Sequence, residues 1–275
     1  MPSSRPSRAA NRPAGAPNVA SGLLERDEPA AVQLRHEEGG SPIVIACDHA
    51  GRRIPRALGS LGLTDTELES HVAWDVGVEG LATRLAQRLE AALVLQSYSR
   101  LVIDCNRAPG SKESITERSE WGQVEGNLDL TPEQVEARRT AVFDPYHAAL
   151  DALVRARRTA GRPLILVGLH SFTPAYRGIA RPWHIGVMHR TDTVTAKALL
   201  AGLRRDERLL VGDNEPFALD NERDQTLAVH GAARGIAHVG IQIRQDLIAD
   251  ESGQTTWAGR LASLLRQIGA TASPA

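Results

Sequence analysis

The chain reads PIVIACDHAG over residues 42–51, and the pattern in this stretch recurs along the sequence. Its apolar part, residues 42–47, is rich in β-branched side chains and predicts a buried strand. The polar turn at 48–51 follows directly and would lie at the carboxyl end of that strand. In open α/β sheets, ligands bind at this end of the strands.

Apolar runs and helical periodicity alternate along the rest of the chain. Strands are expected at 42–47, 92–96, 101–103, 163–169, 184–188, 209–211 and 238–244. Helices are expected at 78–89, 132–159, 194–204, 225–234 and 255–268. The alternation predicts a three-layer α/β fold, in which a mostly parallel or mixed sheet carries helices on both faces.

Composition limits the domain organisation and the partners. Residues 1–35 are rich in Pro, Ala, Ser and Arg and are expected to form a disordered tail, leaving 36–275 as a single α/β domain. The net charge of -1 argues against binding to nucleic acid or to a membrane surface. The two cysteines, Cys47 and Cys105, each close an apolar run, which favours reduced thiols and a cytoplasmic location.

Two histidines follow different predicted strands and are the expected metal ligands. His49 follows the first strand, and His170 follows the strand at 163–169. Neutral imidazoles with a carboxylate, and one position left open for water, are the usual composition of a catalytic zinc site. Asp75 is the nearest acid that could complete the set, although it could equally cap the helix at 78–89. Either histidine alone could instead be a hydrogen-bonded residue at a strand end.

Arginine side chains could bind an anionic group of a small-molecule substrate. Arg107 carries a planar guanidinium suited to a carboxylate, and Asn106 beside it could hold a second polar group. The alternative is that Arg107 pairs with a surface acid. Arg177 and Arg181 are further candidates for anion binding, ranked below Arg107.

The ordered set of motifs resembles the N-formylglutamate amidohydrolase family and, more distantly, the zinc-dependent aspartoacylase and carboxypeptidase-like hydrolases. The supporting strings are DHAG at 48–51, WD at 74–75, SRLVIDCNR at 99–107, LHSF at 169–172, NEP at 214–216 and IRQDL at 243–247. The resemblance implies a phosphorylase/hydrolase-like fold, one zinc ion and cleavage of N-formylglutamate, or a similar N-acylated acidic amino acid, in amino-acid catabolism. It also implies His49 and His170 as zinc ligands, Asn106 and Arg107 as carboxylate-binding residues, and His230 as a pocket residue.

One departure from the family concerns the residue that activates water. In relatives a glutamate often precedes the Ile-Arg pair of the late strand, but here the residue is Gln242, whose amide cannot accept a proton at neutral pH. The role of base would pass to Glu215, Asp246 or Asp48, with Arg244 neutralising the oxyanion or holding the substrate carboxylate. Two alternatives stay open: hydrolysis of another N-acyl amino acid or small peptide, and a non-catalytic member that binds an anion.

Overall fold

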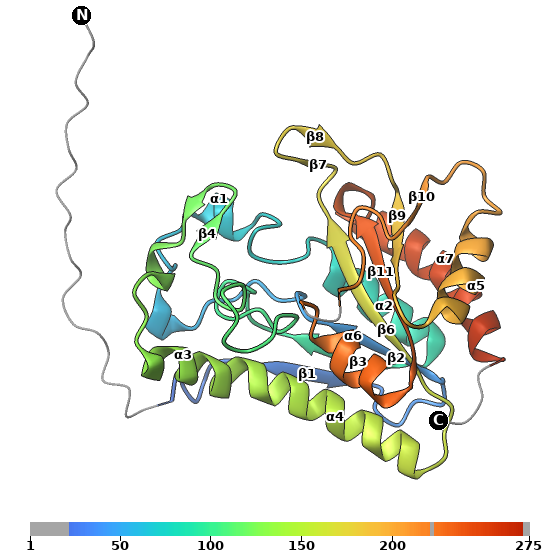
Figure 1. The fold of residues 1–275 in the computed structure, drawn as a ribbon, viewed down its shortest axis with the longest axis horizontal. Helices are drawn as coiled ribbons and strands as arrows, with labels where there is room; N and C mark the ends of the chain where they lie inside the picture. The colour runs from blue at the N-terminus through green and yellow to red at the C-terminus, as the bar shows by residue number, and fades with distance from the viewer. Residues whose placement is uncertain (1–21, 221–222, 272–275) are drawn as a thin grey trace, which may run out of the picture.

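A seven-stranded mixed sheet forms the centre of the computed structural model, which describes residues 22–220 and 223–271 (Figure 1). The strand order is β1-β3-β2-β6-β11-β9-β10, in which β3, β2, β6 and β11 run parallel. The edge strand β1 is antiparallel to β3, and β9 is antiparallel to β11. The strands of the sheet are β1 (Val32–Arg35), β2 (Ile43–Cys47), β3 (Ala92–Gln96), β6 (Ile165–Phe172), β9 (Ile185–Met188), β10 (Val211–Asp213) and β11 (Ala237–Arg244).

Two short hairpins, seven α-helices and several short 3₁₀ and π segments make up the other regular structure of the described residues. The hairpins pair β4 (Arg118–Ser119) with β5 (Gly122–Gln123), and β7 (Ala175–Tyr176) with β8 (Ile179–Ala180). The helices are α1 (Asp65–Leu68), α2 (Val78–Leu89), α3 (Pro132–Arg138), α4 (Asp144–Thr159), α5 (Thr193–Leu203), α6 (Thr226–His230) and α7 (Glu251–Gly269). None of them is long and apolar enough to cross a bilayer.

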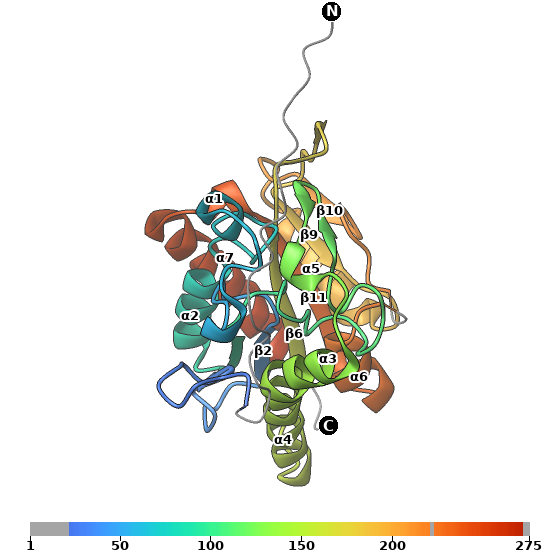
Figure 2. The same cartoon turned by 90° about the vertical axis from the view of Figure 1, so that its left-hand side faces the viewer.

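Helices cover both faces of the sheet, which confirms the three-layer α/β prediction (Figure 2). Successive residues of a strand point to opposite faces. Ile43 and Ile45 of β2 therefore join a core with α2, α5 and α7, whereas Val44 and Ala46 join a core with α4 and α6. Burial on both sides explains why the parallel strands are continuous apolar runs instead of alternating ones.

The helix expected at 132–159 begins where its capping residues predict. Thr131 accepts a hydrogen bond from the backbone of Gln134, whose side chain binds back to the backbone of Thr131, and Pro132 occupies the first turn. The helix continues as α3 and α4 through a π-helical segment, Arg139–Phe143.

Residues 101–103 are not the strand that their apolar character predicts. The backbone N–H of Val102 donates to the carbonyl of Ser99, and the Ser99 hydroxyl accepts from the backbone of Leu101. These contacts fold the segment into a turn, with all three apolar side chains buried. A run of three apolar residues is too short to separate a strand from a buried turn.

The tail expected over 1–35 has the wrong boundary. Its first part, 1–21, lies outside the described residues, but residues 22–35 are described and Val32–Arg35 forms β1. The Tyr98 hydroxyl also donates to the carbonyl of Pro29, and the backbone of Ser97 donates to that of Ala31. These contacts are made with residues more than 60 positions later, so the local composition gave no sign of them.

Candidate metal centre

A cavity lies at the carboxyl ends of β2, β6 and β11, at the edge of the sheet that the sequence indicated. The strand β2 ends directly before Asp48 and His49, and β6 carries His170 near its own carboxyl end. Asp75 reaches the same cavity from the loop before α2. The side chains meet there because parallel strands end at a common edge.

His49, Asp75 and His170 form the one group of potential metal ligands found in the described residues. Each offers one ligand atom, and these atoms all lie within 4.8 Å of one another. The imidazole ring centroids of the two histidines are 5.2 Å apart. The Nδ1 atom of His170 lies 3.0 Å from Oδ2 of Asp75. The structure thus brings together all three residues expected as ligands.

The hydrogen bonds of His49 fit a metal ligand. Its Nε2 lies 2.7 Å from Oδ1 of Asp104, while its Nδ1 is buried and has no hydrogen-bond partner among the described residues. The nearest acid to that Nδ1 is Asp75, at 3.7 Å from Oδ2. A histidine that donates one ring N–H to a carboxylate presents the other nitrogen to a metal. The residues present therefore fit a bound divalent cation.

The pKa of His49 reflects two opposing effects. Burial and the nearby Arg100 guanidinium lower it, but the Asp104 and Asp75 carboxylates together outweigh them and raise the pKa of His49 to about 9. Burial would raise the pKa of Asp104, but the attraction to His49, Arg107 and Arg100 together holds it below its usual value. His49 is therefore a positively charged imidazolium at neutral pH in the metal-free chain. A metal ion that binds to Nδ1 must displace the proton there.

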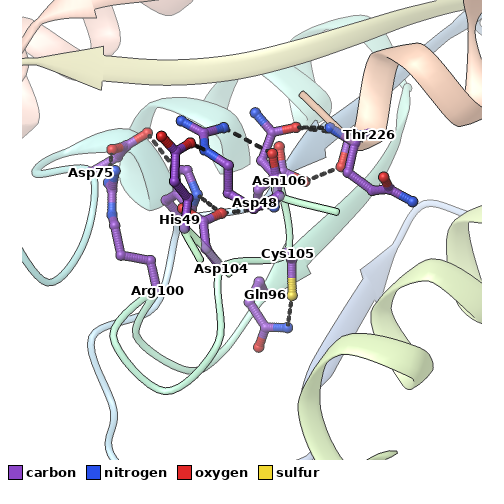
Figure 3. A network of polar contacts seen from close by, with 12 residues as sticks. Asp48, His49, Asp75, Gln96, Arg100, Asp104, Cys105, Asn106 and Thr226 are labelled. Carbon is purple, nitrogen blue, oxygen red and sulfur yellow. Dashed lines mark hydrogen bonds and ion pairs between the residues drawn. The ribbon is translucent and has the colours of Figure 1, made fainter. Parts of the chain in front are cut away.

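Arg100 holds the carboxylate of Asp75. One Nη atom of Arg100 pairs with Oδ1 of Asp75 (Figure 3). The other oxygen, Oδ2, faces the histidines and accepts from the backbone of Ser171 at 3.2 Å. Burial alone would raise the pKa of Asp75, but Arg100 and the two histidines hold it well below its usual range. Asp75 is therefore ionised, with one oxygen directed to the ligand group.

Asp48 is a second buried acid beside the candidate ligands. Its Oδ1 accepts a hydrogen bond from the Thr226 hydroxyl at 2.5 Å (Figure 3). Its Oδ2 has no hydrogen-bond partner within the described chain and lies 3.4 Å from Nε2 of His170. Of the three acids considered as base, Asp48 is the one that lines the cavity.

Asn106 and Arg107 both line the cavity, and both also make contacts within the chain. The side-chain oxygen of Asn106, Oδ1, accepts from the backbone N–H groups of Gln225 and Thr226, at 3.1 Å each, at the start of α6. The Arg107 guanidinium lies 3.0 Å from Oδ1 of Asp224 and 3.2 Å from Oε2 of Glu113. Arg107 therefore pairs with acids as the alternative interpretation expected, while still facing the cavity.

The other expected site residues lie outside the cavity lining. The partly buried Arg244 pairs with the exposed Asp246 through two contacts of 2.8 and 3.2 Å, and Glu215 is exposed. His230 is buried between α6 and α4, where its Nε2 lies 2.9 Å from Nδ1 of His147. Burial lowers the pKa of His230 to about 4, so the ring is neutral.

Arg177 and Arg181 belong to the β7–β8 hairpin, which projects beyond the sheet (Figure 1). The Arg181 guanidinium lies 4.8 Å from the ring centroid of Tyr176 and 4.8 Å from that of Phe217, a residue that lines the cavity. Arg177 lies 5.3 Å from the Tyr176 ring. Arg181 therefore contacts the cavity rim through the Phe217 ring, whereas the ring that Arg177 contacts belongs to the hairpin itself.

Several residues of the site had no role assigned from the sequence, among them Arg100 and Asp104, which hold two of the candidate ligands. Asp104 follows the apolar run at 101–103, so the pattern that indicated the other rim residues applies to it as well. No local sequence pattern indicates the role of Arg100, because its partner Asp75 is 25 positions away.

The fold and the site define a three-layer α/β protein with a candidate metal centre at the carboxyl edge of its sheet. The sequence profile of the N-formylglutamate amidohydrolase family matches residues 41–249, and the chain belongs to this family. The resemblance noted from the motifs is thereby confirmed, and the chain is a member of a hydrolase family.

Solved structures share the fold of this chain. A gene product of Agrobacterium tumefaciens is 37% identical, with a TM-score of 0.86 over 89% of this chain and 97% of that one. The N-formylglutamate amidohydrolase of Ralstonia eutropha is 22% identical, with a TM-score of 0.70 over 88% of this chain and 98% of that one, and supports the fold. The comparison with curated proteins gives no match.

Proposed function

We propose that this chain is a zinc-dependent amidohydrolase that cleaves the N-formyl amide of glutamate, or of a similar small acidic amino acid, to formate and the free amino acid. The observation that carries the proposal is the convergence of His49, Asp75 and His170 at the cavity, with the buried Nδ1 of His49 unpartnered in the described chain. The buried free thiols of Cys47 and Cys105 are consistent with a reaction in the cytoplasm.

His49, Asp75 and His170 would hold the ion. When bound, a zinc ion would supply Lewis-acid polarisation of the formyl carbonyl and a lowered pKa for water. Arg100 keeps Asp75 ionised and oriented, and Asp104 orients the His49 ring by accepting its Nε2–H. The chain's own side chains thus fix two of the three ligands before any ion arrives.

Asp48 is our choice for the base, in preference to Glu215 and Asp246. Its Oδ2 is buried at the cavity and free of hydrogen bonds from the described residues, while the Thr226 hydroxyl fixes its orientation through Oδ1. Asp48 would take a proton from the attacking water and pass it to the leaving amine. Arg107 would bind the substrate carboxylate by sharing donors that now face Asp224 and Glu113.

Metal analysis combined with formate release tests the proposal. The purified, zinc-loaded chain should contain about one zinc per chain and release formate from N-formylglutamate. The His170→Ala variant should lose both the metal and turnover, because one of three ligands is gone. His184→Ala is a matched control, since His184 lies outside the ligand group and the cavity lining. Normal metal content in both His49→Ala and His170→Ala would overturn the ligand assignment.

Gln242 gives a specific reason to keep a second candidate function, a non-catalytic anion-binding protein. Its amide lines the cavity at the position where relatives often carry a glutamate. A panel of N-formyl, N-acetyl and N-succinyl amino acids distinguishes the formyl case from other acyl substrates. A chain that binds zinc and N-formylglutamate without turning it over, and gains turnover as Gln242→Glu, would establish the non-catalytic alternative.

A further inference from the structure

Gln242 lies directly beside a candidate metal ligand. In the register of the neighbouring parallel strands β11 and β6, Gln242 is paired with His170. Paired residues on adjacent strands point to the same face, with the strands about 4.8 Å apart. Gln242 is 1% exposed and lines the same cavity as His49, Asp75 and His170. Its amide is therefore within reach of a ligand bound at the candidate metal centre.

The amide nitrogen of Gln242 holds the cavity wall, the segment 213–220 that lines one side of the cavity. Its Nε2 donates to the backbone carbonyl of Phe217 at 3.0 Å. Phe217 belongs to the segment 213–220, whose residues Phe217, Ala218, Leu219 and Asp220 line one side of the cavity. This hydrogen bond crosses 25 positions of sequence and connects the wall to the central sheet.

The wall packs closely against the strands behind it. The carbonyl oxygen of Glu215 lies only 2.0 Å from the position that a Cβ on Gly186 would occupy, and 2.4 Å from the corresponding position on Gly212. A Cβ on Gly186 would also approach Nε2 of Gln242 to 2.9 Å. The Asn214 side chain accepts from the backbone of His189 at 2.8 Å. The wall is thus seated by several contacts, and its position relative to Gln242 is well defined.

A glutamate could not replace the amide in this contact. An ionised carboxylate has acceptor atoms only, and it would face the Phe217 carbonyl with no donor between them. The amide, in contrast, donates through Nε2 to the wall and keeps its carbonyl oxygen, Oε1, as an acceptor for a group inside the cavity. A scissile secondary amide carries one such donor, its N–H.

We propose that Gln242 has two connected roles: its Nε2 positions the cavity wall, and its Oε1 accepts the N–H of the substrate's scissile amide. This inference rests on the proposed amide hydrolysis and specifies its substrate class. The substrates are N-acyl amino acids with a secondary amide, and an N-alkylated analogue lacks the donor that Gln242 recognises. A site built to receive an N–H discriminates strongly against a ligand without it.

Substrate discrimination tests the acceptor role. For the zinc-loaded wild-type chain, kcat/KM should be at least about 10-fold higher for N-formylglutamate than for N-formyl-N-methylglutamate, beyond the ratio of their uncatalysed hydrolysis rates. Gln242→Met, which has no acceptor, should lose this preference by about the same factor. Gln242→Glu should keep it, because a carboxylate also accepts an N–H. Gln267→Met is the matched control, since Gln267 is an exposed residue of α7.

Hydrogen exchange tests the positioning role and does not need turnover. Backbone amides in 213–220 should exchange faster in both Gln242→Met and Gln242→Glu than in the wild type, since both variants lose the donor to Phe217. An unchanged exchange rate in both variants would overturn the positioning role. An unchanged substrate preference in Gln242→Met would overturn the acceptor role.

Failure of the proposed function has a different signature. A wild-type chain that releases no formate from either compound would refute the hydrolase. The discrimination would then be measured from the dissociation constants of the two compounds by calorimetry. Equal affinity of the wild type for both compounds would refute the recognition of the N–H as well.

Discussion

At the scale of single residues, the site depends on side chains that hold the candidate ligands in place. Asp75 lies between Arg100 on one side and the two histidines on the other. His49 is held by Asp104. These supporting contacts fix the orientation of each ligand and are themselves testable.

Removing the guanidinium of Arg100 should weaken metal binding. The Asp75 carboxylate would lose the contact that fixes its orientation. Loss of such a supporting contact typically costs about 10–100-fold in metal affinity. We expect Arg100→Met to bind zinc more weakly by about this factor in a competition titration, with Arg100→Lys in between. Arg52→Met is the control, because Arg52 is about half exposed and pairs with Glu69 at the surface. Equal zinc affinity of Arg100→Met and wild type would contradict this role.

The ion pair between His49 and Asp104 should make the stability of the metal-free chain depend on pH. The pKa of His49 is about 9 in the folded chain against 6.5 for an ordinary histidine. The folded state then binds the proton more tightly, so this stabilisation is fully present below pH 6.5 and is lost as the pH rises towards 9. Urea unfolding in the presence of a chelator should show a falling free energy of unfolding over this range. Asp104→Asn, which removes the charge, should show a flatter profile, and parallel profiles would refute the prediction.

At the scale of secondary-structure elements, β9 and β10 carry glycines that allow the cavity wall to approach. Gly186 in β9 has no room for a side chain, because the Glu215 carbonyl occupies that position. The requirement for glycine at position 186 comes from the contact between β9 and a loop almost 30 positions later in the sequence. It does not come from the backbone angles of the strand itself.

Gly186→Ala should therefore destabilise the chain and displace the wall. A Cβ at 2.0 Å from a backbone oxygen cannot be accommodated without movement, and such overpacking costs about 1–3 kcal/mol. Gly259→Ala in α7 is the matched control, because a Cβ there meets no atom within 4 Å. That control should be stabilised by about 0.5–1 kcal/mol through helix propensity. Urea unfolding of both variants measures the contrast, and a loss below 0.5 kcal/mol for Gly186→Ala would contradict the close packing.

At the scale of the whole molecule, the sheet extends to a segment that composition alone assigned to a tail. The strand β1 pairs with β3 over Val32–Arg35. The core on the α4 face also includes the buried Ala31, and the partly buried Leu23 and Leu24 pack against it. The folded unit therefore includes residues before position 36.

A chain that begins at residue 36 should be less stable than one that begins at residue 22. The shorter chain loses the β1 ladder and the apolar contacts of Ala31, Val32 and Leu34, a loss of roughly 3 kcal/mol or more from burial alone. Differential scanning calorimetry of the two chains measures the difference. Equal unfolding temperatures would show that β1 contributes nothing to the fold.

The sequence by itself determined most of the elements and the edge of the sheet that carries the site. Long apolar runs predicted β2, β3, β6 and β11. Helical periodicity predicted α2, and a hydroxyl cap followed by proline predicted the start of the α3–α4 helix. Because parallel strands share a carboxyl edge, residues that follow such runs meet there, which is why His49 and His170 could be placed together. These features depend on local pattern and on one general rule of α/β sheets.

Only the tertiary structure decided which polar side chains face the cavity. Glu215 and Asp246 follow strands as Asp48 does, and Arg244 ends β11, yet of these four Asp48 alone lines the cavity. The pairing of Arg100 with Asp75, and of Gln242 with Phe217, likewise joins residues 25 positions apart. The direction of a side chain at a strand end depends on the path of the following loop and on packing against distant residues. Neither produces a periodic pattern in the sequence.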